Sequence, residues 1–147
     1  MSAKMFQRLP TSSLAKQVSR LNLIAGTPKT AFKFGESTKK IELVLLEKNI
    51  AGPSIGLKKF WRVHLPTLKF HNDDVEFFCT RVRATTKEEI AKVPAKIIIH
   101  DTSNNKTEID CSSHDKDRIL RKLVKATGAS PVPMDDIPHI QHPHLAL

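Results

Sequence analysis

Residues 49–65 contain a turn signal, a helix N-cap signal and one apolar stripe at helical spacing. This stretch constrains the fold more than any other part of the sequence. Gly52-Pro53 is a turn signal, and the hydroxyl of Ser54 can accept a hydrogen bond from a free amide of a first helical turn. Apolar residues then recur at helical spacing: Leu57, Phe60, Trp61 and Leu65. We therefore expect a short helix that Ser54 caps, that buries this stripe and that ends at Pro66.

The opposite side of this expected helix carries three cations, Lys58, Lys59 and Arg62. A helix N-terminus with free amides beside cations is suited to binding phosphate. An ordinary amphipathic helix with a solvated basic face explains the same pattern equally well. Phe60 and Trp61 have rings that can stack on nucleic-acid bases, but at helical spacing we expect them in the core.

Two strands flank this helix. Residues 40–48 contain the nearly continuous apolar run Leu43-Val44-Leu45-Leu46, which is typical of a central strand covered on both faces. Residues 75–84 form a second strand, and residues 65–72 are expected to be a loop or an extended connector. Strand, helix and strand at this spacing predict a right-handed crossover with parallel pairing.

A short helical turn and an antiparallel hairpin are expected after the second strand. Thr85 or Thr86 can cap the helical turn, and Pro94 ends it. Residues 95–101 and 107–111 are typical of strands and are separated by a polar loop. A short polar loop between two strands predicts antiparallel pairing.

Residues 115–127 carry the most consistent helix signals in the sequence. Ser112 or Ser113 is placed to cap the N-terminus, and Gly128 is placed to end the helix. Acids near the start and cations near the end suit the helix dipole. The expected apolar face consists of Ile119, Leu120, Leu123 and Val124. These features predict a closing amphipathic helix.

The two ends of the chain differ in composition from its middle. Residues 1–34 contain no acid, and we expect a helix there with Ser12 or Ser13 as its cap and Gly26 as its stop. Such a basic, serine-containing helix is typical of a mitochondrial targeting peptide, and it also suits a helix that lies against RNA. The last residues hold four prolines and three histidines, which predicts an extended tail. We expect a basic N-terminal extension with a helix (1–37), a folded domain (38–128) and a Pro/His-rich tail (129–147).

The positive charge is concentrated in the N-terminal part of the chain. The 24 Lys and Arg outnumber the 15 Asp and Glu, which gives a formal net charge of +9. Residues 1–62 hold this whole excess, whereas residues 63–147 are balanced. The asymmetry indicates a polyanion partner, usually nucleic acid, on one side of the molecule. The candidate RNA contacts are Lys16, Arg20, Lys39, Lys40, Lys58, Lys59 and Arg62.

The sequence argues against catalysis, metal binding and membrane insertion. It has no nucleophile elbow, phosphate-binding glycine loop or zinc-protease motif, and its paired acids, Asp73-Asp74 and Asp135-Asp136, are expected in a turn and in the tail. The tail histidines can bind a metal ion, yet no cysteine or carboxylate joins them at a structural-zinc spacing. No apolar run is long enough to cross a bilayer. We expect no catalytic residue, no metal, no cofactor and no small-molecule substrate.

The order of the expected elements resembles the thioredoxin fold. Val93-Pro94-Ala95 stands where thioredoxins carry a cis-proline, and Ala51-Gly52-Pro53-Ser54 stands where they place Cys-Gly-Pro-Cys. Cys79 and Cys111 are far apart and form no CxxC pair, so two free thiols are expected. Without a thiolate in that motif there is no disulfide exchange, which argues against a redox enzyme of the thioredoxin type.

A closer resemblance is carried by Gly56-Leu57-Lys58-Lys59-Phe60 and Val63-His64-Leu65-Pro66-Thr67-Leu68-Lys69-Phe70. With residues 94–101, the polar hairpin and residues 115–128, these segments resemble a thiol-free thioredoxin-like family over about residues 38–128. Its members are small mitochondrial ribosomal proteins and a small accessory subunit of respiratory complex I. The basic N-terminal helix and the proline-rich tail look most like a large-subunit protein of fungal mitochondrial ribosomes.

This resemblance implies a structural constituent of the mitochondrial ribosome rather than an enzyme. It implies a location in the mitochondrial matrix, and binding to ribosomal RNA and to neighbouring ribosomal proteins. The alternative that it leaves open is the accessory subunit of complex I, which needs no RNA. The acid-free N-terminal extension and the charge excess favour the ribosomal protein.

Overall fold

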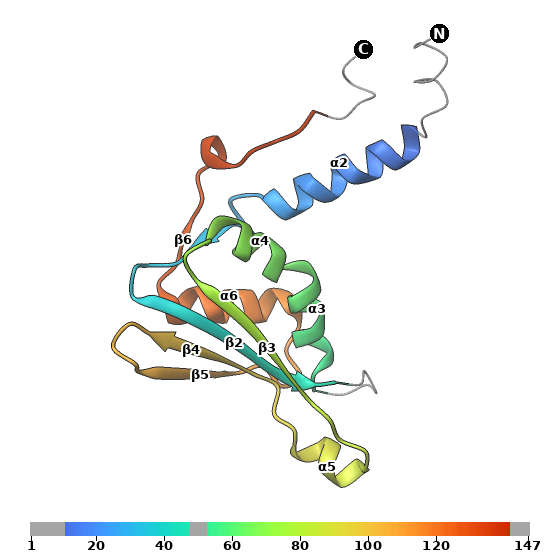
Figure 1. The fold of residues 1–147 in the computed structure, drawn as a ribbon, viewed down its shortest axis with the longest axis vertical. Coiled ribbons are helices and arrows are strands. Elements are labelled where there is room, and N and C mark those ends of the chain that lie inside the picture. Colours follow the sequence, from blue (N-terminus) through green and yellow to red (C-terminus); the bar gives the residue numbers. More distant parts are fainter. Residues whose placement is uncertain (1–10, 48–52, 142–147) are drawn as a thin grey trace.

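A four-stranded mixed sheet with helices packed against it forms the centre of the molecule (Figure 1). The computed structural model describes residues 11–47 and 53–141. The helices are α2 (Thr11–Ala25), α3 (Ile55–Val63), α4 (Leu65–His71), α5 (Lys87–Lys92), α6 (Lys116–Thr127) and the short 3-10 helix η1 (Met134–Asp136). The strands are β1 (Phe32–Lys33), β2 (Thr38–Leu46), β3 (Glu76–Val82), β4 (Lys96–Asp101), β5 (Lys106–Asp110) and β6 (Ser130–Pro131). The expected mixed α/β class with a four-stranded mixed sheet flanked by helices is confirmed.

The strand order in the central sheet is β3-β2-β4-β5. β2 pairs in parallel with β3, with Leu43 opposite Cys79, and antiparallel with β4, with Leu43 opposite Ile97. β4 and β5 form an antiparallel hairpin. The predictions of a parallel strand–helix–strand unit and of an antiparallel hairpin are therefore confirmed. No peptide bond between described residues is cis, so the bond before Pro94 differs from the cis-proline of thioredoxins.

The hydrophobic core lies between the sheet and helices α3, α4 and α6. Leu57 and Phe60 of α3 and Leu68 of α4 are fully buried. They pack in one cluster with Ile41, Leu43 and Leu45 of β2, Ile97 of β4, and Ile119 and Leu123 of α6. Each such side chain contributes about 1.5–3 kcal/mol when it is removed from water. The expected apolar stripes of the second and last helices are thus core, and Phe60 is not free to stack on a base.

The opposite face of the sheet has no helix layer among the described elements (Figure 1), so the expectation that β2 is covered on both faces is wrong. Polar groups explain why this face tolerates water. Lys40 Nζ lies 4.4 Å from the ring centre of Phe78, which is 47% exposed. Glu42 accepts a 2.7 Å hydrogen bond from Thr80 and lies 3.5 Å from His100 Nε2. The Thr80 bond is the main cause that lowers the pKa of Glu42.

Residues 65–72, which we expected to be a loop, instead form helix α4. α3 ends at Val63, and His64 is both its C-cap and the N-cap of α4. Pro66 lies in the first turn of α4, where an amide would have no intrahelical partner, so proline starts a helix here. The Nε2 atom of the buried His64 lies 3.0 Å from Asp117 Oδ1, which ties this junction to α6.

The expected serine caps are only partly correct. Ser54 is the N-cap residue of α3 as expected, but its hydroxyl makes no cap hydrogen bond. The cap of α6 is Asp115, which accepts from the amide of Arg118, and not Ser112 or Ser113. Ser113 has a φ of 59° in a turn that moves the helix start to Asp115. Local sequence places the cap within a few residues, but the turn geometry decides which side chain reaches the amide.

Other expected helix ends are confirmed. Thr86 accepts a hydrogen bond from the amide of Glu89 and so caps α5. α6 ends at Gly128, which has a φ of 66°, and α2 ends before Gly26, which has a φ of 77°. The side chains of Ser12 and Ser13 lie outside the described residues, and so does the stretch 48–52.

The segment after α2 is tied to α4 through backbone groups. Asn72 accepts from the amide of Phe34 at 2.9 Å and donates to the carbonyl of Phe32 at 2.8 Å. Thr67 donates to the carbonyl of Leu23, and His71 Nε2 lies 2.7 Å from the carbonyl oxygen of Ala25. These bonds fix where α2 leaves the body of the protein.

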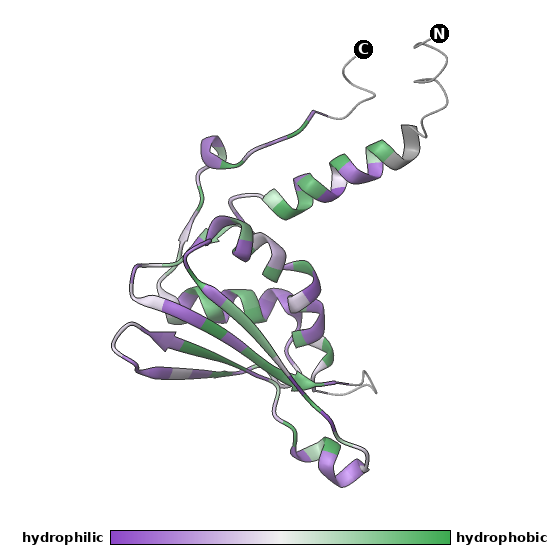
Figure 2. Ribbon diagram, viewed as in Figure 1, coloured by the Kyte–Doolittle hydropathy of each residue, from purple (hydrophilic) through white to green (hydrophobic). Residues whose placement is uncertain are grey.

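The described part of the C-terminal tail is extended and is held by the N-terminal segment. β6 pairs with β1 in a two-stranded antiparallel sheet, and the amide of the buried Val132 donates to the carbonyl of Ala31. Further on, both backbone groups of Ile140 are bonded to the side chain of Asn22 on α2. Figure 2 shows that α2 carries hydrophobic residues along its length. The described part of the tail is therefore tied to the segment after α2 by β1 and β6, and to α2 itself by Asn22.

Candidate nucleic-acid interface

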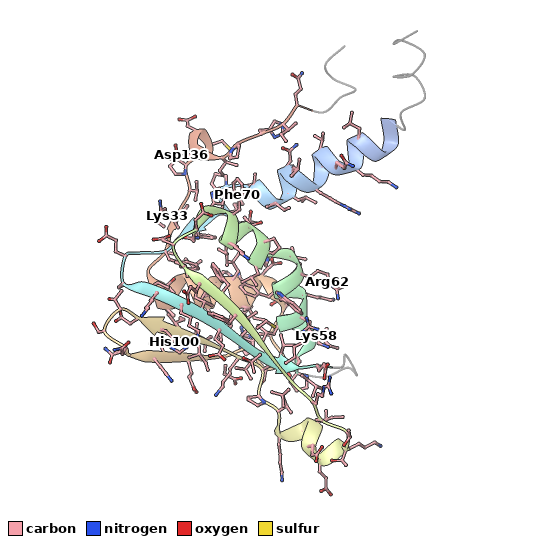
Figure 3. The ribbon with its side chains drawn as sticks, in the orientation of Figure 1. Lys33, Lys58, Arg62, Phe70, His100 and Asp136 are labelled. Carbon is pink, nitrogen blue, oxygen red and sulfur yellow. The ribbon has the colours of Figure 1, made fainter. Side chains whose placement is uncertain are left out.

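The exposed side of α3 is the densest group of predicted RNA contacts. Lys59 and Arg62 are exposed and Lys58 is half-buried. Figure 3 shows Lys58 and Arg62 projecting from this helix at the edge of the molecule. Helical spacing therefore places the cations outside as expected, because Leu57 and Phe60 occupy the inner side of the same helix.

Lys58 is held in place by the end of the central strand. Its Nζ donates to the backbone carbonyl of Glu47 at 3.1 Å. Burial, and then the positive charges of Arg81 and Arg62, lower the pKa of Lys58 below its usual value, while Glu47 acts in the opposite direction. The neighbouring arginines show that positive charge is concentrated at this point.

Arg81 of β3 is a member of this group that the sequence reasoning missed. Its guanidinium carbon lies 4.8 Å from the ring centre of Trp61 on α3, a cation–π contact. Strand alternation places Arg81 on the same sheet face as Phe77 and Cys79, but only the crossover from β2 to β3 brings α3 beside it. The ring of Trp61 is partly buried and packs on the core, as expected.

A cleft of about 470 Å³ lies between α3 and β3, and we call it the Arg81 cleft. It is lined by Leu45, Glu47, Lys58, Trp61, Arg62, Pro66 and Arg81. Glu47 is the one acid among the described residues that line it, and its carboxylate accepts a 2.8 Å hydrogen bond from Arg83. Three cations therefore face one carboxylate that is already paired.

A second depression joins α2 to the α3–α4 junction. This groove has a volume of about 480 Å³, and its lining includes Arg20, Leu23, Arg62 and Val63. Arg62 thus lies on both the groove and the Arg81 cleft. The structure therefore brings the predicted contacts on α2 and α3 to one side, with Lys16 exposed one turn before Arg20.

Two of the predicted contacts lie apart from the cations on α2 and α3. Lys39 and Lys40 lie near the start of β2, at the opposite end of the strand from Glu47 and Lys58. Lys40 is engaged with Phe78 on the open face of the sheet. Lys59 belongs to α3 and also lines a hollow with the residues around the start of α6. Five of the seven predicted residues therefore lie on α2 and α3, and two lie at the start of β2.

The described residues contain no group of three or more His, Cys, Asp or Glu side chains that could hold a metal ion. Asp73-Asp74 and Asp135-Asp136 are exposed, and neither pair lies in a cleft among those described. Of the tail histidines, His142 and His144 lie outside the described residues. Among the described helices, none has the length and apolar character needed to cross a membrane.

We expect both cysteines to react slowly with a thiol reagent in the native protein. Cys111 is fully buried, and burial raises its pKa to about 12. Burial also raises the pKa of the half-buried Cys79. Because the thiolate is the reactive form, DTNB at mildly alkaline pH should label little before denaturation and two thiols after it. Rapid labelling of one thiol in the native chain would contradict this expectation.

The comparison with known proteins gives a relative for most of the chain. The large ribosomal subunit protein mL61 of Saccharomyces cerevisiae is 27% identical over 128 residues. The aligned region covers 86% of this chain and 92% of the yeast protein. This chain is similar to a large-subunit ribosomal protein. No family model matches the chain, so membership of the wider thioredoxin-like family stays a prediction.

Proposed function

We propose that this protein is a structural constituent of the large subunit of the mitochondrial ribosome. It acts in the mitochondrial matrix, catalyses no reaction, and binds ribosomal RNA and neighbouring ribosomal proteins. The observation that carries the proposal is the similarity to mL61, which spans most of both chains. The acid-free, basic N-terminal region supports a mitochondrial protein with a polyanion partner.

The side of the molecule formed by α2 and α3 is the proposed RNA-facing surface. Its cations, Arg20 and Arg62 above all, neutralise phosphates and position the protein without reading base sequence. Lys16, Lys58 and Lys59 add charge around them, and Lys39 and Lys40 make a separate contact at the start of β2. The mechanism is electrostatic and architectural.

Neighbouring ribosomal proteins are proposed to contact α2. Leu14, Leu21 and Leu23 on α2 are 50%, 51% and 75% exposed. Exposed apolar side chains grouped on one helix are typical of a surface that binds another protein. We propose that residues 38–128 are the folded domain, and that residues 1–37 and 129–147 are extensions that reach these neighbours.

Sedimentation of a mitochondrial lysate on a sucrose gradient, with the protein traced by mass spectrometry, tests this function. We expect migration with the large ribosomal subunit that is lost after ribonuclease treatment or at high salt. Migration with the small subunit would correct the placement and keep the ribosomal role. Migration with respiratory complexes, unaffected by ribonuclease, would contradict the proposal and favour the complex I subunit.

Charge reversal on α2 and α3 is expected to release the protein from the ribosome. The chain with Arg20→Glu, Lys59→Glu and Arg62→Glu should require a several-fold lower salt concentration for release, because each lost phosphate contact reduces affinity. All three side chains are exposed, so stability should change by no more than about 0.5 kcal/mol per substitution. The release profile of a tagged chain at increasing salt measures the effect.

A matched variant separates local from global charge. Lys87→Glu, Lys92→Glu and Lys106→Glu make the same change in net charge at exposed positions on α5 and β5. We expect this variant to stay bound at the salt concentrations that release the first one. Equal release of both variants would show that net charge, and not the surface of α2 and α3, holds the protein on the ribosome.

A further inference from the structure

The Arg81 cleft has the features of a built anion site. Arg81, Arg62 and Lys58 converge on it from β3 and α3. We propose that this cleft binds one backbone phosphate of RNA, with the guanidinium groups of Arg81 and Arg62 as its ligands. The proposal rests on the proposed function and deepens it, because it names the contact point and assigns it to a residue outside the predicted set.

Charge balance in the cleft favours an added anion. The carboxylate of Glu47 forms its ion pair with Arg83, and among the described residues it makes no ion pair with the three cleft cations. Lys58 uses the neutral backbone carbonyl of Glu47 instead. Burial first, and then the positive charges of Arg81 and Arg62, lower the pKa of Lys58. A bound phosphate would offset the repulsion among these cations.

Two of the three cleft cations are held in position before binding. The ligand Arg81 lies 4.8 Å from the ring centre of Trp61, and the neighbouring Lys58 donates a 3.1 Å hydrogen bond to the carbonyl of Glu47. Side chains that are ordered in advance lose less conformational entropy when the ligand binds. The planar guanidinium presents parallel N–H groups that match two phosphate oxygens, which an ammonium group does not.

An RNA strand suits this surface better than an acidic peptide. Arg62 lies on both the cleft and the groove that contains Arg20, so cations continue from β3 across α3 to α2. A nucleic-acid strand carries one charge at every nucleotide and can meet successive cations along such a path. The acidic peptide is the competing ligand that the experiment has to distinguish.

The test uses the purified full chain and a fluorescein-labelled oligouridylate whose anisotropy reports binding. We expect Arg81→Gln to weaken binding about tenfold at low salt, and to reduce the slope of log affinity against log salt by about 0.7. Arg121→Gln is the matched control, because Arg121 is exposed on α6 and makes the same change in charge. This control should change neither quantity.

The only tryptophan of the chain gives a second readout at the site itself. Binding of oligouridylate should change the fluorescence of Trp61, which lies directly beneath Arg81. Polyglutamate of equal charge should change it less and compete poorly. If Arg81→Gln alters the circular dichroism spectrum, Arg62→Gln replaces it as the test variant.

Three results would overturn the phosphate site: equal affinities of Arg81→Gln and Arg121→Gln, an unchanged fluorescence of Trp61, or stronger competition by polyglutamate. None of them overturns the ribosomal role, because sedimentation with the large subunit measures that role separately. A chain that sediments with the ribosome but binds oligouridylate independently of Arg81 refutes this site alone.

Discussion

We expect Gly56→Ala to lower the free energy of unfolding by about 3 kcal/mol. A Cβ at this position would overlap the backbone carbonyl oxygen of His114, and it would lie 2.8 Å from the carbonyl carbon. Neither atom belongs to a side chain that can rotate away. The loop before α6 is also fixed to the start of α3, because the amide of Ser113 donates to the carbonyl of Pro53 at 3.2 Å. The methyl group can therefore be accommodated only if α3 and α6 move apart.

Urea denaturation followed by circular dichroism measures this loss, and Gly35→Ala is the control. A Cβ at Gly35 would meet only the Ser37 hydroxyl at 3.9 Å, which is ordinary van der Waals contact. We expect the control to change stability by no more than about 0.5 kcal/mol. Equal effects of the two substitutions would contradict this explanation. They would show that position 56 does not require glycine because of the close packing of α3 against the loop before α6.

The second large effect is expected for Asn72→Ala, at about 3 kcal/mol of lost stability. Asn72 is 1% exposed and makes three hydrogen bonds to the backbone, of which the third is to the carbonyl of Leu68 at 2.7 Å. Its loss removes the partner of the buried amide of Phe34 and of the partly buried carbonyl of Phe32. Unpaired buried groups lose their hydrogen bonds to water without compensation.

The same denaturation measurement, with hydrogen exchange at the Phe34 amide, checks this prediction. Asn22→Ala is the matched control, because the side chain of Asn22 also bonds both backbone groups of one residue, Ile140, but these hydrogen bonds are exposed to solvent. Water replaces those bonds, so we expect a loss of no more than about 1 kcal/mol. A similar loss in both variants would show that burial is not what makes the Asn72 bonds important.

Stability and RNA binding are separable in this molecule. Gly56 and Asn72 act between packed elements, whereas Arg20, Arg62 and Arg81 are exposed. Substitutions of exposed side chains rarely change stability by more than about 0.5 kcal/mol. A variant that loses ribosome binding while keeping its unfolding transition therefore reports on the interface and not on the fold.

Hydropathy periodicity, together with turn and cap signals, predicted most of the central strands and helices. The central apolar run predicted β2, and the strand–helix–strand order predicted its parallel pairing with β3. The end signals of residues 115–127 predicted α6 to within one residue. These features were accessible because periodicity, turns and caps depend on side chains that are near one another in sequence. The concentration of positive charge was likewise a property of the sequence.

Contacts between distant segments of the chain determine where the cations meet. Arg20 and Arg62 come together because Thr67 and His71 bind the backbone at the end of α2 and fix it against α4. Arg81 joins Lys58 because the crossover lays α3 beside β3, while Lys39 and Lys40 remain at the other end of β2. Likewise, Pro66 starts α4 because the buried Leu65 and Leu68 favour a helix there. Sequence spacing sets which face of an element a side chain occupies, but packing between distant segments sets which faces share a surface.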